Sequence, residues 1–439
     1  MSWDRRLVTR RGTLATLGCV VAGGCTTQPD TGDRTTSPDQ DAPETEQTDS
    51  WVPTAASPLE ATVEPTKLII NLDVPWDLAF TPTNDLFVTE RTGTLLRFEA
   101  DEVLAIAENE AAPLDATAVP TSDQHSFLGD HLLGLTTHPE FPDPSFLYVY
   151  VSIEEGSEQY NQVLRYDPQA DDPEASLEII IDRIEGDHTI GGRVAFGPED
   201  DLWVPIGTKD EQRAQDPTVL GGSVLRCTPD GDPAPSNPSL DVDADPRVAS
   251  YGHRNPQGID WLPTGVPVLT DHGPTGHDEI NRHSDGGNYG WPTVRTEPEY
   301  EAHPDYDRPL VNTGPDETWA PANCVRYTGD AISAWHNRLL VATLQGMGLS
   351  IITLRPPDTE QPPVEGDATR YDAEWFDKRY TATAHQTLSG VLGRIRNVAQ
   401  APDGTLLVSS SNRDGLAPDD GQFPRKHDDV LVQLQPVSK

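Results

Sequence analysis

The chain has 439 residues, of which 72 are acidic and 31 basic, for a formal net charge of −41. This length allows two or three average domains or one large all-β domain. The negative charge argues strongly against nucleic acid as a partner, because binding to phosphates requires a basic face. Repulsion among so many carboxylates is screened at about 1 M salt, where the Debye length is about 3 Å, so the composition indicates a halophilic protein.

The first 25 residues have the pattern of an export signal. Arg10 and Arg11 precede an apolar stretch over 14–22, and small residues then lead to Cys25. This pattern predicts a twin-arginine signal peptide over 1–25. The ending VAGGC resembles a lipobox, so we expect an exported protein anchored to the outer face of the cell membrane through a lipid on Cys25. The alternative is a chance cysteine behind the signal.

Residues 26–62 are rich in Thr, Asp, Pro, Gln and Glu and contain few large apolar residues. Such a segment buries too little apolar surface to offset the entropy of ordering it. We therefore predict an acidic disordered linker over 26–62, followed by a catalytic domain over 63–439.

From residue 68 onward a unit of strand, turn and strand recurs six times. The six units open on VPWDLAF, HLLGLTT, GGRVAFG, NPQGIDW, PANCVRY and RIRNVAQ. Apolar residues alternate along these segments, as at Val194 and Phe196, with the two-residue period of a half-buried strand. Turn sequences such as TPTND, GPEDD and APDG follow the first strands. Six such units predict an all-β fold, a six-bladed β-propeller; two β-sandwich domains are the alternative.

Cys227 and Cys324 lie in strand-like segments without metal-ligand spacing. We predict that both are buried small side chains and do not form a disulfide.

Three polar clusters share one phase of the repeat. GDHTIGGR precedes the first strand of the third unit, GHRNPQG that of the fourth, and GRIRNV enters the sixth. Because the inner strand ends of a propeller converge on one axial mouth, we expect these clusters to form a single site.

The clusters contain side chains suited to proton transfer and anion binding. His188, beside Asp187, has an imidazole whose ordinary pKa is near neutral, which suits a general base; a hydrogen-bonded bystander is the alternative. Arg394 and Arg396 are two residues apart on a predicted strand, so they face one side and could grip an anion, as could Arg254. Salt bridges to the abundant carboxylates are the alternative for these arginines.

The segment LTDHGPTGHDEINRHSDGGNYGWP, residues 269–292, offers many carbonyl and carboxylate oxygens, which are the ligands that Ca²⁺ prefers. His272, His277 and His283 could instead suggest a transition metal, but their spacing matches no zinc pattern, so calcium is favoured. An ordinary turn is the other alternative.

Together these motifs resemble the soluble quinoprotein aldose sugar dehydrogenases, which use pyrroloquinoline quinone (PQQ) and Ca²⁺ on a six-bladed propeller. The resemblance extends over about residues 65–439. It is carried by DHTIGGRVAFGP, GHRNPQG, HGPTGHDEIN followed by GGNYGWP, and GRIRN with APDGTL.

The resemblance implies a reaction and roles for individual residues. An aldose would be oxidised at its anomeric carbon to the lactone, with His188 as general base and hydride passing to PQQ. Arg254 would stabilise charge on the quinone oxygen, and Asp187 would orient or polarise His188. Cofactor-binding roles are implied for Gln257, Arg394, Arg396, Asn255 and Trp319. Carbonyls of Gly273 and Pro274 would hold the Ca²⁺ at the quinone, and Glu279 and the backbone of Tyr289 a second, structural Ca²⁺.

Three positions depart from the family pattern. Gly129 stands where the family commonly has Gln, Gln345 where many members have a cofactor-binding Lys, and Asn397 where Asp is usual. A lost Lys contact to a carboxylate costs about 1.5–3 kcal/mol, or tenfold or more in affinity. His131, near Gly129, is a candidate replacement donor.

Two other functions fit the same scaffold. One is a calcium-dependent lactonase or hydrolase, in which the metal faces the substrate and no quinone is needed. The other is a non-enzymatic binding propeller at the cell surface. The resemblance implies an aldose as the small-molecule partner. It identifies neither an electron acceptor nor an oligomeric state.

Overall fold

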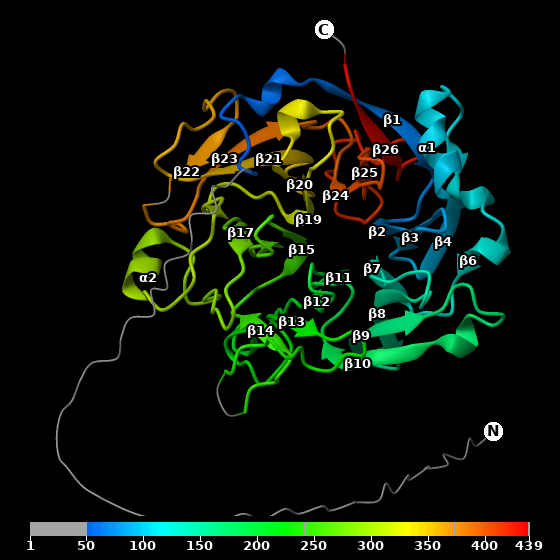
Figure 1. The fold of residues 1–439 in the computed structure, drawn as a ribbon, viewed down its shortest axis with the longest axis horizontal. Coiled ribbons are helices and arrows are strands. Elements are labelled where there is room, and N and C mark those ends of the chain that lie inside the picture. The colour runs from blue at the N-terminus through cyan, green and yellow to red at the C-terminus, as the bar shows by residue number, and fades with distance from the viewer. Residues whose placement is uncertain (1–50, 241–242, 373, 438–439) are drawn as a thin grey trace, which may run out of the picture. The chain divides into compact units, whose positions relative to one another are not determined.

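The computed structural model describes residues 51–240, 243–372 and 374–437. The predicted signal peptide, its lipid-anchor cysteine and most of the predicted linker lie outside these residues. The described chain forms six sheets arranged as blades around a common axis (Figure 1), which confirms the predicted all-β six-bladed propeller. None of its helices has the length and apolar character needed to cross a membrane.

The first three blades follow the chain in order. The first contains β2 (Pro75–Phe80), β3 (Asp85–Glu90), β4 (Thr94–Glu99) and β6 (Gln124–His125). The second contains β7 (His131–Thr137), β8 (Leu147–Glu155), β9 (Glu158–Tyr166) and β10 (Glu178–Glu185). The third contains β11 (Ala195–Phe196), β12 (Leu202–Pro205), β13 (Ser223–Cys227) and β14 (Val248–Tyr251).

The fourth and fifth blades continue this order, whereas the sixth combines both ends of the described chain. The fourth contains β15 (Pro256–Trp261), β16 (Pro267–Asp271), β17 (Glu279–Arg282) and β18 (Val311–Asn312). The fifth contains β19 (Pro321–Arg326), β20 (Leu339–Thr343), β21 (Gly348–Arg355), β23 (Thr381–Thr387) and β22 (Thr369–Tyr371). The sixth contains β24 (Ile395–Gln400), β25 (Leu406–Ser410), β26 (Leu431–Pro436), β1 (Val63–Ile70) and β5 (Leu114–Asp115).

The helices are short and connect strands. They are α1 (Ala100–Glu108), α2 (Glu297–Ala302) and the 3-10 turns Pro58–Glu60, Ala116–Ala118, Thr121–Asp123, Glu174–Ser176, Arg213–Gln215 and Ser333–Trp335. The repeat analysis did not predict α1. It packs Val103 and Ile106, one helical turn apart, into an apolar cluster with residues of β1 and β3.

The six innermost strands, β2, β7, β11, β15, β19 and β24, lie around the centre of the ring in Figure 1. Apolar side chains fill the spaces between neighbouring sheets. One such cluster joins Leu340 and Ile351 of the fifth blade to Val408 and Val432 of the sixth. Each side chain of this kind contributes about 1.5–3 kcal/mol when it is fully buried.

The ring is closed by pairing between its first and last strands. β1 runs antiparallel to β26, from Val63 opposite Pro436 to Ile69 opposite Leu431. The strand before the first repeat unit therefore belongs to the sixth blade. The pairing covers a strand edge that an open ring would leave exposed.

Residues 51–62 correct the predicted boundary of the linker, because they pack against the fifth blade. The Trp51 side chain is only 9% exposed, and its ring meets that of Tyr380 edge to face with centroids 5.9 Å apart. Trp335 Nε1 donates to the Pro58 carbonyl at 3.0 Å, and Arg338 Nη2 donates to the Ala56 carbonyl at 2.7 Å. The composition of 26–62 does not predict this packing, because the contacts are made by one tryptophan and a few backbone carbonyls.

The two cysteines behave as predicted. Cys227 in β13 and Cys324 in β19 are buried free thiols in different blades. Burial raises the pKa of the Cys227 thiol to about 12, so the thiol stays protonated and unreactive.

We expect Trp51→Ala to lower the free energy of unfolding by about 3 kcal/mol, because the substitution empties a buried site on the fifth blade. Leu416→Ala is the matched control, since Leu416 is 65% exposed and should change stability little. Urea unfolding at one fixed salt concentration measures both values. Equal stabilities for the two variants would show that the segment around Trp51 adds nothing to the fold.

Candidate functional site

Beta-bulges in three innermost strands direct side chains to a common place. In β2, β15 and β24 the register skips one residue, leaving Trp76, Gln257 and Arg396 unpaired. A bulge of this kind re-aims the side chain it carries. The Arg396 guanidinium lies 4.1 Å from the centroid of the Trp76 ring, and its Nη1 donates to Gln257 Oε1 at 3.0 Å. The GHRNPQG and GRIRN motifs therefore meet, as their shared phase predicts.

A buried polar network continues from this contact across the axis. Asp77 forms an ion pair with Arg193 and accepts hydrogen bonds from Asn397 Nδ2 at 2.7 Å and the Leu135 amide at 3.0 Å. Arg193 Nε donates to the Gln257 carbonyl at 3.0 Å. The amide of Asn397 suits its place, because an aspartate there would put a second carboxylate against Asp77.

Arg394 and Arg396 of the sixth motif pair with a single carboxylate, that of Asp414. Arg394 donates twice to Asp414 Oδ2, at 3.0 and 2.8 Å, and Arg396 Nη2 lies 3.7 Å from the same oxygen. Arg91 Nη2 donates to the Asp414 carbonyl at 3.3 Å. Burial lowers the pKa of Arg396 to about 9, and the charges of Arg394 and Arg91 act in the same direction. Arg396 Nε is buried without a hydrogen-bond partner, so an anionic ligand would stabilise this cluster.

His188 lies in the loop between β10 and β11 and is half-buried. Its ring packs against that of His131, with centroids 4.0 Å apart and planes tilted by 35°. Its Nδ1 is buried without a hydrogen-bond partner. Burial lowers the pKa of His188, and the charges of His131 and Arg91 lower it further. A lowered pKa keeps the imidazole neutral, with a lone pair available to take a proton.

Asp187 does not make the contact with His188 that its position suggests. Its carboxylate accepts hydrogen bonds from Lys209 Nζ at 2.8 Å and from the Thr189 amide at 2.8 Å. Its charge raises the pKa of His188 only through space. The ring that packs against His188 is that of His131, at the start of β7.

Asn255 secures the loop that carries His188. Its Oδ1 accepts a hydrogen bond from the Gly191 amide. A Cβ at Gly191, where φ is +66°, would lie 2.6 Å from the Gly207 amide nitrogen, and one at Gly192 would lie 2.7 Å from Leu133 Cδ1. The two glycines therefore let the loop pack against its neighbours, and the space beside them is filled by protein rather than left for a cofactor.

Arg254 is fixed by a carboxylate at the end of β16. Asp271 accepts hydrogen bonds from the Arg254 amide at 3.2 Å and the Asn255 amide at 2.7 Å. The Arg254 side chain points toward the segment 269–292, which is predicted to bind calcium. Its Nη1 donates to the carbonyls of His272 at 2.6 Å and Gly273 at 2.9 Å. Burial lowers the pKa of Arg254.

The predicted metal ligands gather around one small cavity of about 20 Å³. Gly273, Pro274, Glu279 and Tyr289 all line it, together with Asp271. This volume has room for one ion or one water molecule. The structure therefore brings the residues expected at two sites to a single cavity.

Both acidic and basic side chains line this cavity, with Asp271 and Glu279 offering carboxylates and Arg254 and Arg295 guanidinium groups. Burial and the charge of Asp271 raise the pKa of Glu279 to about 8, although Tyr300 OH and Asn312 Nδ2 each donate to Glu279 Oε1 at 3.0 Å. Two carboxylates facing one cavity repel each other unless a proton or a cation lies between them. Within the described residues, His272, His277 and His283 do not form a metal-binding group.

Trp319 is a core residue rather than an open contact surface. It is 2% exposed, its amide donates to Asp278 Oδ2 at 2.6 Å, and its Nε1 donates to Glu317 Oε1 at 2.6 Å. Gln345 is exposed, and its backbone amide donates to the Trp319 carbonyl at 3.0 Å.

Sequence reasoning missed Trp76, Asp77, Arg91 and Asp414. The first two could have been found, because VPWD enters the first blade at the phase at which GHRNPQG and GRIRN enter theirs. Arg91 and Asp414 lie in loops outside that phase, and no pattern marks them.

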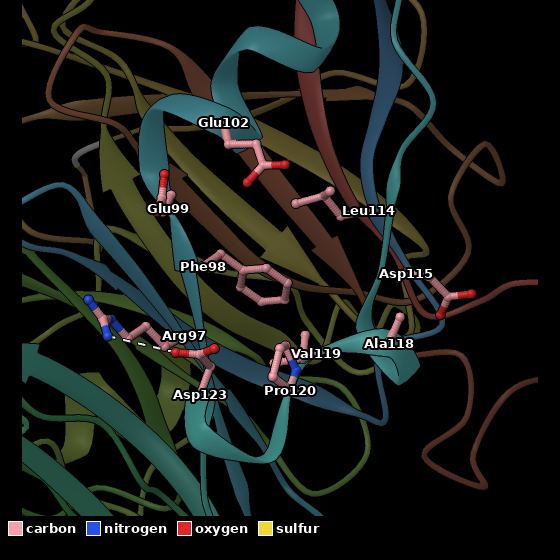
Figure 2. Close-up of a pocket in the computed structure, with 10 residues that line it drawn as sticks. All are labelled: Arg97, Phe98, Glu99, Glu102, Leu114, Asp115, Ala118, Val119, Pro120 and Asp123. Carbon is pink, nitrogen blue, oxygen red and sulfur yellow. Dashed lines mark ion pairs between the residues drawn. The ribbon is translucent and has the colours of Figure 1, made fainter.

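A separate pocket of about 340 Å³ lies at the outer part of the first blade (Figure 2). It is lined by Arg97, Phe98, Glu99, Glu102, Leu114, Asp115, Ala118, Val119, Pro120 and Asp123. Arg97 Nη1 lies 3.7 Å from Asp123 Oδ1, so the one basic side chain is already paired. None of the candidate site residues lines this pocket.

Comparisons with known proteins agree with the motifs. A family model described as glucose / sorbosone dehydrogenase matches residues 72–417. The aldose sugar dehydrogenase of Escherichia coli (strain K12) is 27% identical over 372 residues, covering 81% of this chain and 92% of that protein. Quinoprotein glucose dehydrogenase B of Acinetobacter calcoaceticus is 28% identical over 258 residues, 52% of each protein. The PQQ-bound structure of the aldose sugar dehydrogenase of Streptomyces coelicolor has a TM-score of 0.65 at 25% identity, covering 88% of this chain and 100% of that one.

We expect Gln257→Ala to lower the free energy of unfolding by about 2 kcal/mol, because it removes the acceptor of a buried guanidinium. Gln345→Ala, at an exposed glutamine, should leave stability unchanged. Urea unfolding of the ligand-free proteins measures both changes. An unchanged Gln257→Ala protein would mean that the contact with Arg396 does not stabilise the fold.

Proposed function

Because the chain belongs to the glucose/sorbosone dehydrogenase family, we propose that it oxidises the anomeric carbon of an aldose sugar to the lactone, with PQQ and Ca²⁺ as cofactors. The observation that carries this proposal is the position of Arg91. Its side chain contacts Asp414 in the arginine cluster, and its carbonyl accepts a hydrogen bond from His131 Nδ1 at 2.8 Å, beside His188. Arg91 thus links the candidate base to the arginine cluster, which supports the proposal of one shared site.

The residues present fit both cofactors. PQQ, when bound, supplies the two-electron acceptor of the reaction. Arg394 and Arg396 would bind its carboxylates, which explains why an acidic chain keeps buried arginines with too few acidic partners. Gln257 would hold Arg396 in place. Ca²⁺ would lie in the cavity that Asp271 and Glu279 line, with their carboxylate oxygens as ligands and the Arg254 and Arg295 side chains at the same cavity.

The chain's own contribution to the chemistry lies in His188 and Arg254. A ring nitrogen of His188 would take the proton of the anomeric hydroxyl. Arg254, held by Asp271 and by two backbone carbonyls, would place a fixed positive charge where negative charge develops. Asp187 would tune the pKa of His188 through its charge, and His131 would orient the ring.

We also propose that the protein works outside the cell in high salt, tethered by a lipid on Cys25. The twin-arginine pattern before that cysteine and the net charge of −41 support this setting. The electron acceptor of the reaction would then be located outside the cell membrane.

Reconstitution with PQQ and Ca²⁺ tests the proposed reaction. We expect aldose-dependent reduction of an artificial dye, and a fall in kcat of about 10²–10⁴-fold in His188→Gln, because general base catalysis is lost. His336→Gln, at another partly exposed histidine, is the matched control and should keep full activity. A titration that leaves the PQQ absorbance band unchanged, with lactone hydrolysis present, would instead favour the calcium-dependent lactonase.

The pH profile should report the surroundings of His188. Because burial and the charge of His131 lower its pKa, kcat/KM should stay high below pH 6.5, the ordinary histidine value, and fall only at lower pH. His131→Gln removes one positive charge, so the acid limb should move to higher pH. Dye-reduction assays across the acid range measure this shift. An acid limb that His131→Gln leaves in place would mean that the charge of His131 does not act on the base.

A further inference from the structure

Three potential metal ligands, one of which is the proposed base, lie close together outside the cavity predicted to bind calcium. His131 opens β7, Glu154 lies near the end of β8, and His188 follows β10. One ligand atom from each residue lies within 4.8 Å of the other two. The antiparallel pairing of β7 with β8, in which His131 lies opposite Ser152, brings His131 and Glu154 together.

The hydrogen bonds of His131 leave one ring nitrogen facing a carboxylate. Its Nδ1 lies 2.8 Å from the Arg91 carbonyl, which can only accept, so Nδ1 carries the hydrogen. In a neutral ring Nε2 then presents a lone pair, and this atom lies 3.3 Å from Glu154 Oε1. A lone pair and a carboxylate oxygen face each other stably only with a proton or a metal ion between them. An Nδ1–H bound to a backbone carbonyl is also the usual arrangement behind a metal-binding Nε2.

The surrounding contacts hold Glu154, leave His188 Nδ1 unpartnered and give an ion access. The Glu154 amide donates to Asp130 Oδ2 at 2.7 Å, and Gln159 Nε2 donates to Glu154 Oε1 at 2.8 Å. His188 Nδ1 has no hydrogen-bond partner. The His131 and Glu154 side chains are 24% and 48% exposed, so an ion can enter and keep a water molecule as a fourth ligand.

The ligand set selects the class of metal. Two imidazole nitrogens and one carboxylate suit Zn²⁺, whereas Ca²⁺ and Mg²⁺ prefer oxygen ligands alone. We propose that His131, Glu154 and His188 form a zinc-binding site, and that Zn²⁺ bound there occupies the lone pair of His188 and inhibits the enzyme. The inhibition rests on the proposed role of His188, whereas zinc binding does not.

Calorimetric titration of the full chain with ZnCl₂ tests the site directly. Excess Mg²⁺ in the buffer occupies sites made of carboxylates alone, which matters in a chain with 72 acidic residues. We expect one zinc site in the wild type, weakened at least about tenfold in His131→Gln and in Glu154→Gln, and unchanged in His336→Gln. Equal zinc affinity in all four proteins, or no zinc binding by the wild type, would overturn the proposal.

Two further measurements keep the result interpretable. Thermal melting shows whether each variant is folded, and Co²⁺ in place of Zn²⁺ should give the visible absorption of a low-coordinate site in the wild type and lose it in both ligand variants. In turnover assays zinc should inhibit the wild type and leave Glu154→Gln active. Zinc binding without inhibition would confirm the metal site and contradict the proposed role of His188, so the two proposals can fail separately.

Discussion

The polar contacts around the axis determine what this propeller can hold. Bulges in the innermost strands turn Trp76, Gln257 and Arg396 toward one another. Asp77 extends the contact to the third blade through its ion pair with Arg193 and to the second through the Leu135 amide. A buried ion pair adds little net stability over a well-packed apolar core, but removing one partner leaves an uncompensated charge. These contacts hold the blades in one relative arrangement, which in turn fixes the positions of the side chains at the axial mouth.

Charge is distributed unevenly between the surface and this centre. The chain as a whole carries −41, yet Arg394 and Arg396 share the single carboxylate of Asp414, and Arg91 donates to the backbone carbonyl of the same residue. High salt would screen the acidic surface and would act much less on buried arginines. At high salt an anionic ligand would therefore still be attracted to the buried arginines, although the charges on the protein surface are screened.

The sequence predicted the parts of the structure that repeat. The strand period and the six turns located the blades, and the shared phase brought Gln257 and Arg396 together. The partners of the base were not predictable in this way. Asp187 is adjacent to His188 in sequence, yet its carboxylate pairs with Lys209, while the neighbouring ring comes from His131, far away in sequence at the start of β7. The packing of Trp51 against the fifth blade was also not predictable from composition. The average composition of a segment does not reveal a contact made by one aromatic residue.

The pairing of β1 with β26 has a consequence for how the chain reaches this fold. Five blades are made of residues close together in sequence and can form as local units, but the sixth needs strands from the two ends of the described chain. Contacts between such distant segments form slowly, because the loop entropy is lost before the contacts stabilise the chain. Assembly therefore ends at the sixth blade, and until it closes, β26 lacks its outer partner and offers an open strand edge to other chains.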